Sequence, residues 1–202
     1  MLVSNIKQTS PGRFTVELDD GSEIRTTLGA VTELRLFVGR ELCEADVEEL
    51  KCLSERQLAR EKALELLSRR MMSRSELIKK LTEKGESADT AEYCAQWLTE
   101  NGFLDDGRYA DAIARHYAAK GYGAGRIRTE LSRRGIPREL WEEAEAPESD
   151  DRLAALIRKR LKDPSDRDEV RKLSAALYRR GFSWEEIRRA LAEFDSSSDF
   201  ED

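Results

Sequence analysis

Residues 97–135 read WLTENGFLDDGRYADAIARHYAAKGYGAGRIRTELSRRG, and the rest of the chain is organised around this stretch. It predicts a turn, a helix, a loop punctuated by glycines, and a second helix. Between Arg108 and Arg134 there are seven Lys or Arg residues against two Asp or Glu residues, although the 202-residue chain carries a formal net charge of −6. The stretch is therefore a basic segment in an acidic chain.

The end of this stretch recurs twice elsewhere in the chain. ELSRRG at 130–135 aligns with KLTEKG at 80–85 and with ALYRRG at 176–181, at offsets of 50 and 46 residues. Three positions align in each copy: an apolar residue, a leucine one helical turn later, and a glycine four residues after that. They are Leu77, Leu81 and Gly85; Ile127, Leu131 and Gly135; and Leu173, Leu177 and Gly181. This pattern predicts tandem three-helix repeats, in which neighbouring helices complete each other's cores.

The repeats divide the chain into five predicted parts. Residues 1–53 are a β-rich extension with a linker helix, and 54–104, 105–147 and 148–194 are the three-helix repeats. Residues 195–202, DSSSDFED, are polar and acidic and are predicted to be a disordered tail. The expected fold is mostly α: an elongated curved array of tandem three-helix repeats, with a small N-terminal β-hairpin or three-stranded meander.

The N-terminal extension contains strand-like runs. RFTVEL at 13–18 and SEIRTTL at 22–28 are separated by a turn cluster ending at Gly21, and another short strand is predicted over 2–8. A sheet of this size is marginal alone, so we expect it to pack as a cap on the following helix. An independent recognition module is the alternative.

Two helices are predicted to follow the strands. A short one, containing Leu34 and Phe37, ends near Gly39, although a strand is the alternative there. A longer one runs from about Glu44 to Met71, with an a/d-like stripe that we expect to be core rather than a partner seam. The stripe consists of Leu50, Leu53, Gln57, Arg60, Leu64, Leu67 and Met71.

Cap residues mark where the helices of the repeats begin and end. Three pairs with the spacing of a capping box, or close to it, predict helix starts: Ser73 with Glu76, Ser183 with Glu186, and Asp166 with Glu169. The three aligned glycines each follow a Lys or Arg, which is typical of left-handed helix ends. Each repeat also has one tryptophan, which we expect to fill a helix seam rather than stack on bases: Trp97, Trp141 and Trp184.

Composition excludes several classes of protein. No apolar run approaches the roughly 20 residues that cross a bilayer, and the first residues lack the pattern of a secretory signal. We therefore expect a soluble, cytoplasmic protein without a membrane partner. Cys43, Cys52 and Cys94 are odd in number and lack metal-ligand spacing, which favours reduced thiols. A sequence pI near 5.2 argues against bulk binding of duplex nucleic acid.

No catalytic constellation is found. His116 is the single histidine and has no nucleophile assigned to it, and the glycines at 121, 123 and 125 lack the preceding strand of a dinucleotide fingerprint. Asp105 and Asp106 stand at a predicted helix start, where carboxylates normally cap N–H groups. We expect no enzyme activity, no cofactor and no metal.

The remaining functional candidates are Lys and Arg side chains expected at the surface of the helices. Arginine forks suit phosphates or partner carboxylates, whereas solvated i, i+4 ion pairs such as Arg126 with Glu130 are the alternative. The candidate partner-binding residues are Arg69, Arg70, Arg74, Lys79, Lys80, Arg115, Lys120, Arg126, Arg128, Arg133, Arg134, Arg158, Arg160, Arg171, Lys172, Arg179 and Arg180.

NGFLDDGRYA at 101–110 and KGYGAGRIRTELSRRGI at 120–136 resemble the most recognisable stretch of the RecX regulatory proteins. The resemblance covers about residues 56–194 and is strongest in the middle repeat. It implies a monomeric modulator that binds the RecA filament on single-stranded DNA and limits its ATPase, recombinase and coprotease activities. Many members are basic whereas this chain is acidic, so we expect contact with single-stranded DNA mainly through the filament. The alternative is a helical-repeat adaptor or nucleic-acid-binding protein unrelated to RecA.

Overall fold

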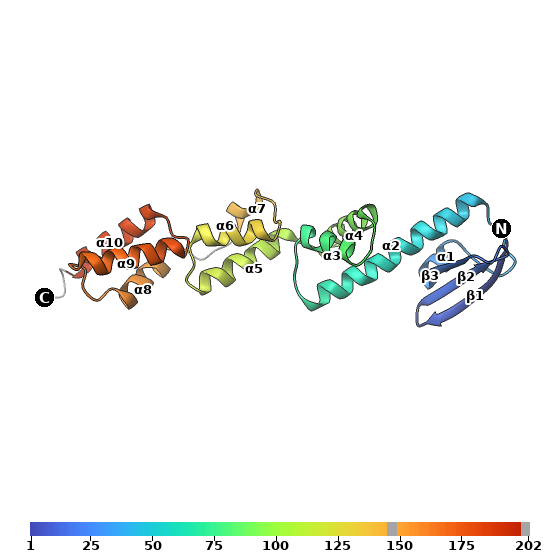
Figure 1. The fold of residues 1–202 in the computed structure, drawn as a ribbon, viewed down its shortest axis with the longest axis horizontal. Coiled ribbons are helices and arrows are strands. Elements are labelled where there is room, and N and C mark those ends of the chain that lie inside the picture. The colour runs from blue at the N-terminus through green and yellow to red at the C-terminus, as the bar shows by residue number, and fades with distance from the viewer. Residues whose placement is uncertain (145–148, 199–202) are drawn as a thin grey trace. The chain divides into compact units, whose positions relative to one another are not determined.

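The computed structural model describes residues 1–144 and 149–198, and within them it shows one small sheet followed by helices (Figure 1). The strands are β1 (Val3–Ser10), β2 (Arg13–Leu18) and β3 (Glu23–Thr27). The helices are α1 (Leu28–Glu33), α2 (Glu44–Arg69), α3 (Arg74–Glu83), α4 (Ala88–Glu100), α5 (Asp106–Ala119), α6 (Ala124–Arg133), α7 (Leu140–Glu143), α8 (Ser149–Arg160), α9 (Arg167–Arg179) and α10 (Trp184–Ser198).

The chain divides into two compact units. Unit 1 comprises Met1–Met72 and Glu76–Leu104, and unit 2 comprises Ser73–Ser75 and Asp105–Asp202. Unit 1 contains the sheet and the helices α1 to α4, and unit 2 contains α5 to α10. A mostly helical fold built from tandem three-helix groups with a small N-terminal sheet confirms the predicted fold class.

The predicted three-stranded meander is present, with strand order β1-β2-β3 and antiparallel pairing throughout. Its inner side chains, Val16 and Leu18 among them, share one core with Val47 and Leu50 of α2. The sheet therefore packs on the helix that follows, as expected for strands too few to be stable alone.

The short helix after the sheet differs from its prediction. It begins directly behind β3, where the Thr27 hydroxyl accepts a hydrogen bond from the N–H of Ala30 at 3.2 Å, and it ends at Glu33. The predicted end near Gly39 is wrong. Arg35 takes a left-handed φ of 48°, and the N–H of Gly39 donates to the carbonyl of Val3 at 2.8 Å, so this segment returns to β1 instead.

α2 has two buried faces rather than one stripe. Near its start Leu50 and Ser54 are buried against the sheet, and further on Ala59 and Ala63 are buried in the core shared with α3 and α4. The step from Ser54 to Ala59 turns the buried face by about 140° at 3.6 residues per turn. The predicted stripe is therefore only partly correct: Leu50 is buried, whereas Met71, at the end of the stripe, lies beyond the end of α2 and is 48% exposed.

The aligned residues of the three repeats lie in three separate cores. The apolar residue and the leucine of each copy are at most 7% exposed: Leu77 and Leu81, Ile127 and Leu131, Leu173 and Leu177. The aligned glycines all take left-handed φ angles, of 94° at Gly85, 65° at Gly135 and 93° at Gly181. The repeat alignment and the glycine helix ends are thus confirmed.

Three of the predicted caps are formed by the expected groups. Asp166 is one of them and accepts from the N–H of Glu169 at 3.2 Å. The N–H of Ser183 donates to the Glu186 carboxylate at 2.7 Å, and the Ser183 hydroxyl accepts from the Glu186 N–H at 3.2 Å. Asp105 accepts from the Arg108 N–H at 2.9 Å and caps α5.

At the end of the chain, α10 continues to Ser198, so the first residues of the predicted disordered tail are helical. The remaining tail residues, 199–202, and Pro147 in the link between repeats lie outside the described residues.

The tryptophans do not share one environment. Trp97 and Trp141 are half-buried against the cores of their repeats, as predicted. Trp184 is 50% exposed, so its predicted place in a core is wrong. The core position is occupied by Phe182, which is 1% exposed, and the ring of Trp184 stacks instead on Tyr178, with ring centroids 4.9 Å apart.

Candidate partner-binding surface

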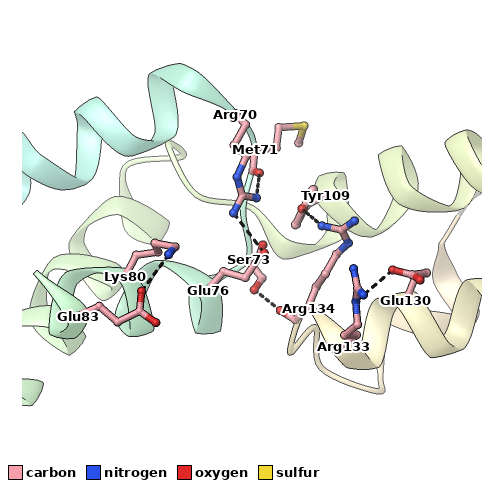
Figure 2. Close-up of polar contacts among 10 residues, drawn as sticks. All are labelled: Arg70, Met71, Ser73, Glu76, Lys80, Glu83, Tyr109, Glu130, Arg133 and Arg134. Carbon is pink, nitrogen blue, oxygen red and sulfur yellow. Dashed lines mark hydrogen bonds and ion pairs between the residues drawn. The ribbon is translucent and has the colours of Figure 1, made fainter.

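Two predicted surface arginines of α6 are tied to a buried acid. Glu130 is 2% exposed, and its carboxylate lies 3.1 Å from Arg126 and 3.5 Å from Arg133 (Figure 2 shows the second pair). A carboxylate taken out of water needs such cations, because an unpaired buried charge is costly. Arg126 and Arg133 remain partly exposed, but each has a structural role in unit 2.

Arg134 is bound at both its side chain and its backbone. Its Nη1 donates to the Tyr109 hydroxyl at 2.9 Å, and its guanidinium lies 5.8 Å from the centre of the Tyr109 ring. The carbonyl oxygen of Arg134 accepts a hydrogen bond from the Ser73 hydroxyl (Figure 2). These contacts all lie within unit 2, and they make Arg134 an internal brace rather than a free docking group.

Arg180 is held in the corresponding way one repeat later. Its Nη1 donates to the Gly121 carbonyl at 3.3 Å, and its guanidinium lies 5.7 Å from the centre of the Tyr122 ring. Its own carbonyl accepts from the N–H of Gly123 at 2.9 Å. Arg180 therefore joins the second and third repeats.

Several candidates on unit 1 form ion pairs at its surface. Arg69 pairs with Glu65 at 2.5 Å, Arg70 with Glu76 at 3.4 Å, and Lys80 with Glu83 at 2.9 Å (Figure 2 shows the last two). Arg171 of unit 2 pairs likewise with Asp168 at 3.2 Å. Exposed pairs of this kind contribute at most about 1 kcal/mol, so a partner could displace them at little cost.

Arg74 and Arg115 are also engaged rather than free, although their side chains differ in exposure. Arg74 is half-buried at the start of α3, where its N–H donates to the Asp106 carboxylate at 2.8 Å. Arg115 is exposed on α5, on the side away from the buried Tyr109 and Ile113, as predicted. Asp105 and Asp106 thus both serve backbone N–H groups, which is the architectural role expected of them.

The remaining candidates are exposed and form no ion pair with any residue in the part of the chain that the structure describes. They are Lys79 on unit 1 and Lys120, Arg128, Arg158, Arg160, Lys172 and Arg179 on unit 2. We call the six on unit 2 the unpaired cations. Arg158, Arg160 and Arg179 stand in the last turn of their helices, where they also complement the helix dipole.

Lys172 and Arg179 form the most regular part of this set. Both are exposed on α9, and seven residues of helix place them on the same side, about 10 Å apart along the axis. Such a pair can contact two acidic groups on one partner. The structure thus separates the candidate list into internal braces, surface ion pairs and unpaired cations.

Sequence reasoning missed an aromatic pair beside these cations. Tyr178 and Trp184 are 52% and 50% exposed and stack with their planes 17° apart. Arg188 lies one turn after Trp184 on α10 and is exposed. The available signal was that Phe182 already supplies an aromatic residue to the core two positions before Trp184, leaving the second ring without a place inside.

The single histidine, His116, lies on α5. His116 is exposed, and its ring meets the Tyr117 ring edge-on with centroids 5.4 Å apart. Among residues 1–144 and 149–198, no three His, Cys, Asp or Glu side chains are grouped so that they could hold a metal ion. The described helices include none with the length and apolar character needed to cross a membrane.

Three family models match this chain in consecutive stretches. The first three-helix domain of RecX matches residues 59–98, the second 105–144 and the third 148–191. The first stretch begins within α2 and ends in α4, the second spans α5 to α7, and the third runs from α8 into α10.

Individual proteins show the same similarity. The regulatory protein RecX of Xanthomonas axonopodis pv. citri (strain 306) is 39% identical over 140 residues, which cover 67% of this chain and 86% of that protein. The regulatory protein RecX of Chromohalobacter salexigens is 36% identical over 137 residues, covering 66% and 90%. A crystal structure of regulatory protein RecX superposes with a TM-score of 0.74 at 25% identity, covering 93% of this chain and 97% of the other. The structure of RecX from Lactobacillus salivarius, at 23% identity and a TM-score of 0.65, shares the fold over 70% of this chain.

Proposed function

We propose, from the premise that this chain belongs to the RecX family of regulatory proteins, that it binds the RecA filament on single-stranded DNA and inhibits RecA. The activities lowered would be ATP hydrolysis, strand exchange and the coprotease activity. The protein would act as a cytoplasmic monomer and would reach DNA mainly through the filament.

The unpaired cations of unit 2 carry this proposal. Six exposed Lys or Arg side chains have no acidic partner in the described residues, although the whole chain has a net charge of −6. An acidic protein gains little from nonspecific attraction to duplex phosphates, because such binding needs a continuous positive face. Separate positive groups on a helical scaffold fit a partner that presents acidic side chains at defined places, as a protein filament does.

Binding to adjacent subunits would explain inhibition without any catalytic group. A regulator that contacts two subunits of a helical polymer stabilises one arrangement of those subunits relative to the others. ATP hydrolysis that needs a different arrangement would then be slowed. The proposal therefore requires no cofactor and no reactive side chain from this protein.

The test is RecA ATPase activity on single-stranded DNA, with this protein added at increasing ratios to RecA. We expect hydrolysis to fall as the protein is added. The double variant Lys172→Glu/Arg179→Glu should need about tenfold more protein for the same effect, since two close ionic contacts would become repulsive. The matched control is Arg35→Glu/Lys51→Glu, which reverses two exposed cations of unit 1 outside the candidate set and should inhibit like the original protein.

An unchanged ATPase rate at several-fold excess over RecA would reject the proposal. Binding to DNA alone with a steep salt dependence, together with no effect on RecA, would instead identify a nucleic-acid-binding protein unrelated to RecA. Equal inhibition by the Lys172→Glu/Arg179→Glu variant would show that these two residues of α9 are not part of the docking surface.

A further inference from the structure

A hollow with a volume of about 540 Å³ is present in unit 1 where the sheet meets α2. Arg13 and Thr15 of β2, Arg25 and Thr26 of β3, and Lys62 of α2 line it, and Phe14 contributes part of an apolar wall. The lining residues come from the three strands and from α2, which is far from them in sequence but packs on the sheet in the same unit. None of its basic residues belongs to the candidate surface described above.

The charges around this hollow are one-sided. Arg13, Arg25 and Lys62 line it, and no carboxylate does so among the described residues. The nearby acids already have partners: Glu61 pairs with the Nη2 of Arg13, and Glu86 lies 2.5 Å from Lys62. Arg25 is exposed and forms no ion pair within residues 1–144 and 149–198. Two of the three cations are therefore balanced by acids, and Arg25 supplies the net positive charge of the hollow.

Arg13 adds an unsatisfied donor. Its Nη1 is buried and makes no hydrogen bond, whereas its Nη2 is held by Glu61. A buried donor without a partner costs about 1–3 kcal/mol, so the structure gains when an acceptor reaches it. The pairing with Glu61 fixes one side of the guanidinium fork, and a ligand oxygen would satisfy the donor on the other side after a small movement of the side chain.

We propose that this hollow binds the phosphate group of a nucleotide, either free or within a single strand. The guanidinium groups and the Lys62 ammonium would contact the phosphate oxygens. The apolar wall at Phe14 fits the sugar or base. A volume of about 540 Å³ lies within the range of small-ligand sites.

A second hollow could extend the site to a longer single strand of nucleic acid. It has a volume of about 360 Å³ and is lined by Lys62, Arg69 and Lys84 and by one acid, Glu65, which pairs with Arg69. Lys62 thus lies at the junction of two basic hollows along α2 in unit 1. A single strand could place successive phosphates in both, whereas a free nucleotide would occupy the first alone.

The test uses the full chain without RecA, so its result is independent of the function proposed above. The probes are inorganic phosphate, ADP and a fluorescent oligo-dT strand, measured by calorimetry and fluorescence anisotropy. We expect ADP or the strand to bind and inorganic phosphate to compete. The variant Arg25→Gln/Lys62→Gln should bind about tenfold more weakly or worse, because two charged contacts are lost.

The matched control is Arg35→Gln/Lys51→Gln, which removes the same charge from unit 1 outside the hollow and should bind normally. Circular dichroism of each variant checks that the fold is retained. Binding of ADP identifies a free nucleotide as the ligand, and binding of oligo-dT alone identifies the strand. No binding of any probe, or equal loss in variant and control, would overturn the proposal.

Discussion

The backbone N–H of Gly123 donates a hydrogen bond to the carbonyl oxygen of Arg180, 2.9 Å away, and so joins the start of α6 to the end of α9. Next to it, the N–H of Gly125 donates to the carbonyl of Gly181, also at 2.9 Å. A Cβ atom added at Gly123 would lie 2.6 Å from the backbone of Gly181. The sequence predicted only a loop at Gly123 and Gly125. In the structure, both glycines form contacts between two repeats.

Gly181→Ala should destabilise the protein much more than Gly85→Ala. Both glycines have φ angles near +93°, which cost a residue with a Cβ atom about 1 kcal/mol or more. At Gly85 the added atom meets nothing within 4 Å, but at Gly181 it would lie 2.3 Å from the Arg126 nitrogen. We expect an additional loss of about 1–3 kcal/mol for Gly181→Ala, measured by urea unfolding. Equal losses would show that the contact between α6 and α9 is not tight.

Arg134→Ala should lower the free energy of unfolding by about 1–2 kcal/mol, whereas Arg128→Ala should change it by less than about 0.5 kcal/mol. Arg134 is half-buried and donates to the Tyr109 hydroxyl, and Arg128 on the same stretch is exposed without an ion pair in the described residues. Thermal unfolding of both variants gives the comparison. If Arg128→Ala proves the more damaging of the two, the division into braces and unpaired cations is wrong.

Trp141→Ala should cost more stability than Trp184→Ala. The Trp141 indole N–H donates to the Ile136 carbonyl at 3.0 Å, and the ring is half-buried against the second core, so its loss should cost about 3 kcal/mol. Trp184 is 50% exposed and loses mainly its stacking on Tyr178, about 1 kcal/mol. Calorimetric melting temperatures test the order. A larger drop for Trp184→Ala would place that ring in a core after all.

Cys94 should make the stability fall at alkaline pH. Burial raises the pKa of its thiol from 9.0 to about 11. The folded protein therefore favours the protonated thiol; this contribution is complete below pH 9 and is lost as the pH rises to about 11. Urea unfolding between pH 8 and 11 should show this loss in the original protein and less of it in Cys94→Ala.

The same burial predicts the reactivity of the thiols. At pH 8 the exposed Cys43 should react quickly with a thiol reagent in the folded protein, and Cys94 only after unfolding. Rapid labelling of Cys94, or identical pH profiles for Cys94→Ala and the original protein, would contradict the pKa argument.

Local sequence features by themselves determined the repeat and where its helices begin and end. The spacing of Leu77 and Leu81 places both on one side of a helix, and a glycine after a helix can take a left-handed φ at little cost, so both features are readable without tertiary contacts. The capping pair of Ser183 and Glu186 is local in the same sense, since its members are three residues apart.

Only the tertiary structure decided which cations are available and where the chain leaves a hollow. Arg128 and Arg134 belong to the same basic run, yet the second is engaged because Tyr109, 25 residues away in sequence, lies beside it. The hollow at Arg13, Arg25 and Lys62 likewise exists because strands and a distant helix pack together. Charge and hydrophobic periodicity report which groups a helix face carries, but the partner of each group is set by the packing of separate elements.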